Sequence, residues 1–166
     1  MYSLIIKKIY MKISNKFEPL LAGLFASLII GLLSFLSFET STGFWLMFSF
    51  GSTTLIVLVF YESEFAQPAN VFLGHLLAIV IGILFNEFFG MSYLTLGLSV
   101  GFTVSLMMYF NIIHPPAAAN PLIALFADVS LGYIVFPVMT GTIVIIILSV
   151  IINRYLLKRN YPKRWF

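Results

Sequence analysis

Long apolar stretches separated by short polar segments dominate the chain. A helix needs about 20 apolar residues to cross a bilayer core of about 30 Å. Stretches close to that length occupy residues 19–38, 44–61, 71–89, 93–113 and 133–152. The pattern predicts an all-α, multi-pass transmembrane protein with about five full spans.

A further apolar segment, residues 114–127, carries three prolines. As a regular helix it would cover only about 21 Å, and prolines prevent such a helix through its first half. An extended first half followed by a short helix would cover roughly 34 Å. The same reasoning applies to residues 44–61, with an extended run up to Phe50 and a helix from Ser52.

Two such broken crossings in corresponding places predict an internal 3+3 inverted repeat, with halves at residues 19–89 and 93–152. In transporters built this way, the substrate site lies near the midplane between the broken helices. A four-span arrangement with re-entrant segments satisfies the same pattern, so both architectures remain open. Gly97 and Gly101 have the spacing of a close-packing face, for contacts within the chain or in a homo-oligomer.

The basic residues of the chain are concentrated at its two ends. Apolar residues make up 61% of the sequence and charged residues 9%, too few to cover a water-facing surface. All nine Lys and Arg residues lie within residues 7–16 or 154–164. The positive-inside rule therefore predicts a protein of the cell (plasma) membrane with both termini cytoplasmic. Basic residues are not interleaved with the folded surface, so we expect no nucleic-acid partner.

These charges also divide the chain. Residues 1–16 form a basic cytoplasmic N-terminal segment, either an interfacial helix or a frayed tail. Residues 17–153 form the transmembrane domain, and residues 154–166 form a basic cytoplasmic C-terminal tail.

Motifs of enzyme chemistry are lacking in the sequence. Cysteine does not occur, and the two histidines, His75 and His114, do not have the spacing of a zinc motif. Nucleophile-elbow and nucleotide-binding motifs are also missing. We expect a protein that is not an enzyme and that has no cofactor or metal. An intramembrane enzyme would need His114 within hydrogen-bond reach of a Ser or Asp side chain.

The broken crossings carry the candidate substrate site. Irregular backbone at membrane depth is tolerated where it is buried in protein or lines a wet cavity, and helix N-termini there attract anions. We expect Ser52–Thr54 to begin one half-helix, and Asn120 to cap the other with Pro121 as its first residue. The candidate substrate-binding residues are Gly51, Ser52, Thr53, Thr54, His75, His114, Pro115, Pro116, Ala117 and Asn120.

Each histidine allows two interpretations. His114 either donates to an anion or relays a proton, or it bonds the free carbonyl groups at the end of a helix. His75 either lines the pathway or makes a hydrogen bond between helices. No Lys or Arg occurs within residues 17–153, so the site favours a small monovalent anion over phosphate.

Four motifs in order resemble a known family. They are Phe50-Gly51-Ser52, then Ala66-Gln67-Pro68 with Gly74-His75-Leu76-Leu77, then His114-Pro115-Pro116, and finally Tyr161-Pro162-Lys163-Arg164-Trp165-Phe166. From Pro19 onward the chain resembles the HPP family of integral membrane proteins. Some plastid and cyanobacterial members are linked to nitrite transport, so the resemblance implies nitrite as the leading candidate. The family's usual arginine in its AQPRN motif is Ala69 here, a departure that bears on the substrate.

Together these patterns predict a membrane transporter of a small inorganic anion in the lipid bilayer. The alternative is a non-transporting membrane anchor or assembly subunit. A polar cavity bounded by residues 51–54 and 114–120 would favour transport, and dry packing there would favour the anchor.

Overall fold

The structure is a computed structural model that describes residues 17–41 and 45–165. The basic N-terminal segment, residues 1–16, lies outside the described residues. The described chain is helical and contains no strand. Its elements are α2 (Glu18–Glu39), α3 (Ser49–Val59), η1 (Glu64–Ala66), α4 (Pro68–Phe89), α5 (Tyr93–Tyr109), η2 (Pro115–Ala119), α6 (Asn120–Ala127), η3 (Ile134–Met139), α7 (Thr140–Val150) and η4 (Ile151–Leu156).

Three helical segments are long and apolar enough to cross a membrane: α2, α4 and Ile134–Leu156, in which η3, α7 and η4 follow one another with a kink at Phe136. The expectation of about five full spans is therefore not met by helix length. The other apolar helices, α3, α5 and the η2–α6 segment, are shorter. Helix α5 ends at Tyr109, ahead of the predicted Ile113, and Asn111 just beyond it has a positive φ of 55°. That left-handed conformation turns the chain away from the helix axis.

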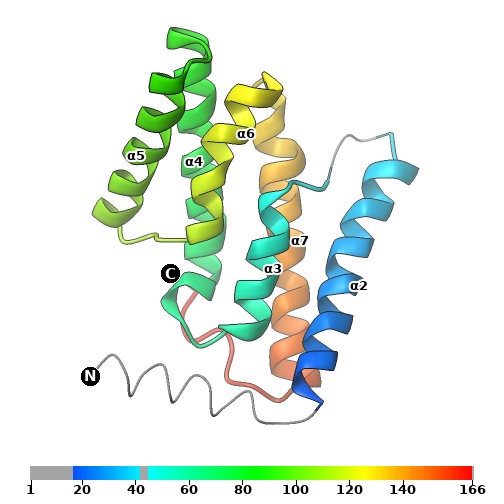
Figure 1. Cartoon of the computed structure of the whole chain (residues 1–166). Coiled ribbons are helices and arrows are strands. Elements are labelled where there is room, and N and C mark those ends of the chain that lie inside the picture. Colours follow the sequence, from blue (N-terminus) through cyan, green and yellow to red (C-terminus); the bar gives the residue numbers. More distant parts are fainter. Residues whose placement is uncertain (1–16, 42–44, 166) are drawn as a thin grey trace.

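The chain reverses direction from each apolar helix to the next (Figure 1). Helices α2, α4 and α6 run upward in that view, and α3, α5 and α7 run downward. The start of α2 and the C-terminal tail consequently meet at one end, where the Arg159 guanidinium pairs with the Glu18 carboxylate. Alternating helix directions of this kind are what a chain with both ends on one side of a membrane needs. Which side that is, and whether the two halves are an inverted repeat, stay predictions.

Helix α4 is the centre of the bundle and contacts α5, α6, α7, η2 and η3. Two glycines on α4 allow the η2–α6 segment to lie directly against it. A Cβ atom on Gly74 would come within 2.9 Å of the His114 Cβ, and one on Gly82 within 2.6 Å of the Ala124 Cβ. These contacts fix the depth at which the proline-rich segment sits along α4.

The expected close packing at Gly97 and Gly101 is wrong for contacts within the described chain. Both glycines are exposed, and a Cβ atom on either would have no atom of another described element within 4 Å. The small-residue spacing alone does not distinguish a packed face from one that faces outward.

Both broken crossings differ in detail from the prediction. Residues 45–47 are not helical, but α3 begins at Ser49 instead of Ser52. Residues 115–119 form the 3₁₀ helix η2 instead of an extended run, and η2 continues directly into α6, so Ala119 and not Asn120 is the N-cap residue. Prolines fit the first turn of such a helix because the N–H groups there need no helical partner.

Ser37 and Gly141 contact residues 45–47, the segment that leads into α3. The backbone N–H groups of Trp45 and Leu46 donate to the Ser37 Oγ at 2.9 and 3.1 Å. A Cβ atom on Gly141 of α7 would lie 2.7 Å from the Trp45 carbonyl oxygen and 2.3 Å from the Phe50 ring. The missing side chain at Gly141 thus makes room for the segment that leads into α3.

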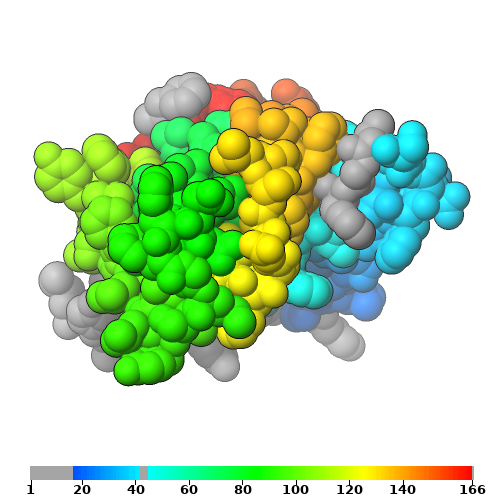
Figure 2. Space-filling model, turned by 90° about the horizontal axis from the view of Figure 1, so that it is seen from above, coloured from blue at the N-terminus to red at the C-terminus, as the bar shows by residue number. Residues whose placement is uncertain are grey.

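The C-terminal tail is tied to the lower end of the bundle. Arg159 donates through Nη1 to the Leu58 carbonyl oxygen at 2.8 Å, and the Tyr161 hydroxyl donates to the Ala66 carbonyl oxygen at 2.8 Å. Burial raises the pKa of the Tyr161 hydroxyl, so it stays a neutral donor. At the opposite end, seen from above in Figure 2, the α4–α5 end, the α6–α7 connection and the end of α2 lie side by side.

The glycine contacts lead to a first prediction. Gly82→Ala should lower the stability of the purified protein by about 1–3 kcal/mol, because the added methyl group overpacks the contact with α6. The matched control Gly101→Ala should be neutral or stabilising by roughly 0.5–1 kcal/mol, since it adds helix propensity in open space. Thermal unfolding in detergent measures both. Equal midpoints for the two variants would contradict the packing described here.

Candidate functional site

Four polar side chains meet inside the bundle, and we call them the histidine cluster: Thr53, His75, His114 and Asn120. Each is completely buried. Thr53 comes from α3, His75 from α4, His114 from the link before η2, and Asn120 from the start of α6. The two imidazole rings lie 4.9 Å apart between centroids. The structure thus joins one candidate residue from each of four separate segments.

The Thr53 hydroxyl bridges the two histidines. Its Oγ1 lies 2.8 Å from Nε2 of His75 and 3.0 Å from Nε2 of His114. The remaining ring nitrogens have other partners: His75 Nδ1 lies 2.9 Å from the Asn120 amide nitrogen, and His114 Nδ1 lies 2.7 Å from the Phe65 carbonyl oxygen. All four ring nitrogens are therefore satisfied within the protein.

The partners determine which atoms carry the protons. The Phe65 carbonyl can only accept, so Nδ1 of His114 carries a proton and donates it. The Asn120 amide nitrogen can only donate, so Nδ1 of His75 accepts and, in the neutral ring, Nε2 carries the proton. Thr53 then accepts from His75 and donates to His114. One consistent set of donors and acceptors results, with both histidines neutral.

Ser49 extends this chain of hydrogen bonds toward the surface. Its hydroxyl donates to Oδ1 of Asn120 at 2.9 Å, while the Asn120 amide nitrogen also donates to the His75 carbonyl oxygen at 3.1 Å. The oxygen and the nitrogen of the Asn120 side-chain amide are thereby assigned. Because Ser49 begins α3 and Asn120 begins α6, the N-terminal ends of these two helices meet at this bond.

Apolar contacts enclose the cluster. The Phe50 ring packs edge-on against His75, with centroids 5.4 Å apart and an interplanar angle of 86°. Ala78, Met107 and Ala117 form a small buried apolar group nearby, with Leu77 and Ile113 packed against it. Gly74, directly before His75, admits the His114 backbone. A low-polarity surrounding strengthens the hydrogen bonds of the cluster and makes any unpaired member costly.

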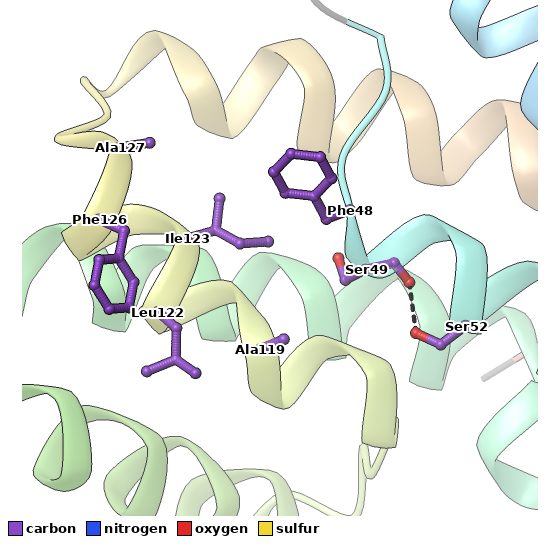
Figure 3. A pocket seen from close by; sticks show the side chains of 8 residues that line it. All are labelled: Phe48, Ser49, Ser52, Ala119, Leu122, Ile123, Phe126 and Ala127. Atoms are coloured by element: carbon purple, nitrogen blue, oxygen red, sulfur yellow. Dashed lines mark hydrogen bonds between the residues drawn. The ribbon is translucent and has the colours of Figure 1, made fainter.

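A groove lies beside the cluster, between α3 and α6 (Figure 3). Its volume is about 470 Å³. It is lined by Phe48, Ser49, Ser52, Ala119, Leu122, Ile123, Phe126 and Ala127. Ser49 therefore both lines the groove and bonds to Asn120. The polar side chains of residues 53, 114 and 120 do not line the expected polar cavity but are fully buried and hydrogen-bonded within the protein, which is the dry packing expected of the anchor, and the groove beside them is mostly apolar.

The other predicted site residues lie outside the cluster. Gly51, Ser52 and Pro115 are exposed, and Pro116 and Ala117 are buried in packing. The Ser52 hydroxyl, predicted to point from the start of a half-helix, bonds instead to the Ser49 carbonyl oxygen of its own helix at 2.9 Å. The Thr53 hydroxyl lies 3.1 Å from the same oxygen in addition to bridging the two histidines. The buried Thr54 hydroxyl has no partner among the described residues.

Sequence reasoning missed Ser49, the Phe65 carbonyl and Asn70. Ser49 precedes Thr53 by one helical turn, a spacing that places both on one face. Asn70 donates through Nδ2 to the Ile113 carbonyl oxygen at 3.0 Å and accepts from Nη2 of Arg164 at 3.3 Å. This places a guanidinium group close to the backbone that carries His114.

The chemistry of the cluster is that of two imidazole rings that share one hydroxyl. Its donors besides the histidines are a hydroxyl and an amide, and no group of three His, Cys, Asp or Glu residues gathers in the described part of the chain. The side chain that reaches His114 is Thr53, where the enzyme hypothesis needs a Ser or Asp. Within this closed arrangement, the two imidazole rings are the groups that can take up a proton.

Apolar helices around a buried polar cluster define a multi-pass integral membrane protein. The family model described as HPP, transmembrane region, matches residues 11–162, and the chain belongs to this family.

Two relatives are transmembrane proteins of Dictyostelium discoideum. One is 27% identical over 129 residues, covering 71% of this chain and 44% of the relative. The other is 26% identical over 129 residues, covering 73% and 42%. The chain therefore spans less than half the length of the curated relatives it matches. No solved structure matches the chain.

The bridging hydroxyl leads to a second prediction. Thr53→Val should leave His75 Nε2 and His114 Nε2 buried without their partner, at a cost of about 1–3 kcal/mol for each unsatisfied group. The control Ser52→Ala removes an exposed hydroxyl that bonds only its own helix, so the change should stay within about 0.5 kcal/mol. Chemical or thermal unfolding in detergent compares the two. A Thr53→Val protein as stable as Ser52→Ala would show that the bridge is not formed.

Proposed function

We propose that this protein is a membrane transporter of a small monovalent anion, with nitrite as the leading candidate. The observation that carries the proposal is the bond between Ser49 and Asn120, where the starts of α3 and α6 meet beside a groove. The start of α3 carries the positive end of a helix dipole, and the helical segment that contains α6 carries another at Pro115, where η2 begins. A helix start within apolar helices suits an anion.

The energetic cost of the histidine cluster also supports a functional site. Polar side chains inside a membrane protein are expensive to bury, and they tend to mark substrate or proton pathways. The four residues come from four segments, so a change at any of them would alter the packing of several helices. An interior serving packing alone needs no such network.

The sign of nearby charge favours an anion over a cation. Arg164 reaches Asn70, which bonds the carbonyl of the residue before His114. The described residues of α3, α6 and η2 include no carboxylate that would attract a cation. In the proposed setting, the protein lies in the cell membrane with both termini cytoplasmic, and Arg164 attracts anions at the cytoplasmic end.

One observation favours the second candidate function, a non-transporting anchor or assembly subunit. The histidine cluster is closed, because every ring nitrogen has a protein partner and no member is exposed. Transport requires this cluster or its neighbourhood to open toward the groove. An anchor would keep the same closed structure throughout its function.

Flux measurements in proteoliposomes separate the two functions and give a third prediction. Wild-type protein should carry nitrite faster than protein-free liposomes do, with nitrate, formate and chloride as competitors. Arg164→Gln should reduce flux at subsaturating anion about tenfold, the effect of losing about 1.4 kcal/mol of attraction. Lys163→Gln removes the same charge from an exposed neighbour and should have little effect.

Three results would decide between the proposals. Selective flux of another anion would keep the transporter and replace the substrate. Equal losses in the two charge variants would mean that Arg164 acts only as part of the overall tail charge. Folded protein that carries none of these anions would contradict the transporter and favour the anchor.

A further inference from the structure

The two histidines of the cluster differ in their capacity to bind a proton. His75 Nδ1 faces the donating amide nitrogen of Asn120. That amide cannot turn over freely, because its nitrogen also donates to the His75 carbonyl oxygen at 3.1 Å. A turned amide would set two acceptor oxygens against each other. A proton on His75 Nδ1 would therefore face an N–H donor, and the hydrogen bond there would be lost.

His114 has no such obstacle. Its Nδ1 proton donates to the Phe65 carbonyl in either charge state. Its Nε2 accepts from the Thr53 hydroxyl, and that hydroxyl has a second acceptor, the Ser49 carbonyl oxygen at 3.1 Å. If the Thr53 hydrogen rotates from His114 to Ser49, the Thr53 oxygen can accept from both histidines at once. Protonation of Nε2 then needs no heavy atom to move and leaves every hydrogen bond of His114 in place.

We propose that His114 is the proton-binding residue of this protein, with the Thr53 hydroxyl as its switch, and that the proton and the transported anion bind together. The joint binding rests on the proposed function. One proton adds to Nε2 of neutral His114 as the Thr53 hydrogen turns to the Ser49 carbonyl. Release on the other side of the membrane reverses both changes, so the pair crosses without net charge.

The surroundings of His114 give the reason for joint binding. A buried imidazolium is costly unless an opposite charge accompanies it. The titratable or charged groups on the elements packed around His114 are His75 and Glu87 on α4, Tyr93 and Tyr109 on α5, Glu64 on η1, and Tyr161, Lys163 and Arg164 in the tail. Helices α3 and α6 carry none.

None of these groups supplies the missing negative charge. His75 is neutral in the hydrogen-bond network, and the nearest charge through that network is the positive Arg164. Glu64 is exposed on η1, and Glu87 lies about 18 Å from His75 along α4. A bound anion beside Ser49 would provide the counter-charge. By linkage, the anion must then favour protonation of His114 to the same extent that the proton favours anion binding.

Nitrogen NMR tests the proton site without depending on transport. The chain has two histidines, so protein labelled with ¹⁵N-histidine and purified without a histidine tag shows two rings, assigned with His75→Gln and His114→Gln. Titration in nanodiscs should show His114 gaining a proton as the pH falls, while His75 keeps its proton on Nε2. Saturating nitrite should move the His114 transition upward by about one pH unit for each tenfold of coupling.

Two variants show whether Thr53 is the switch. Thr53→Ser keeps the hydroxyl and should preserve the nitrite-dependent shift of the His114 transition. Thr53→Val removes the hydroxyl and should abolish the shift. Thermal unfolding of both variants shows that the compared proteins are folded. Ser27→Ala, which removes an exposed hydroxyl on α2 that bonds the Gly23 carbonyl oxygen of its own helix, serves as a folded control in which the shift stays.

Flux separates failure of this inference from failure of transport. In liposomes containing a pH-sensitive dye, wild type should acidify the lumen with anion entry beyond the protein-free rate. His114→Gln should still exchange anion but without acidification or pH dependence. A His114 signal that ignores nitrite, or a proton that binds His75 first, overturns the proton site even if anions are carried. Nitrite-dependent protonation without flux keeps the site and overturns transport.

Discussion

The structure depends on one constraint: a polar side chain taken into the apolar interior is costly unless it finds a hydrogen-bond partner there. A single hydroxyl, that of Thr53, meets this requirement for two imidazole rings from different segments. The position of Thr53 depends on where α3 begins, and α3 can begin at Ser49 because Gly141 leaves room for the residues that lead into it. The site is therefore a product of helix packing, and the helices in turn are held in register by the site.

The long helices could be predicted from the sequence because their apolar runs match the thickness of a bilayer. Helices α2, α4 and the last helix appear close to the expected bounds. The starts of the broken segments could not be placed as well. Ser49 begins α3 three residues early, and prolines 115 and 116 enter a 3₁₀ turn, because local propensity does not tell where a neighbouring helix supplies packing.

Four of the predicted site residues meet in the cluster, since a polar residue in an apolar span needs other polar groups as hydrogen-bond partners. The role of each residue in the cluster could not be predicted from the sequence. Asn120 has the sequence signature of a helix cap, yet its amide orients His75 and accepts from Ser49. The Phe65 carbonyl carries no side-chain signal at all. Gly74 and Gly82 pack closely while Gly97 and Gly101 do not, and one sequence shows no difference between the pairs.

The two glycines of α4 also restrict how the molecule can move. A Cβ atom added at either glycine would lie only 2.6–2.9 Å from the facing Cβ atom, so α4 and the η2–α6 segment are in close contact at both positions, and we expect them to move together. Across the groove, α3 faces α6 with open space instead. The surface along which parts can shear therefore separates α3 from the unit formed by α4 and α6, and so divides the first sequence half, which contains both α3 and α4. The mechanical units of this protein do not coincide with its sequence halves, since α4 belongs by order to one half and by contact to the other.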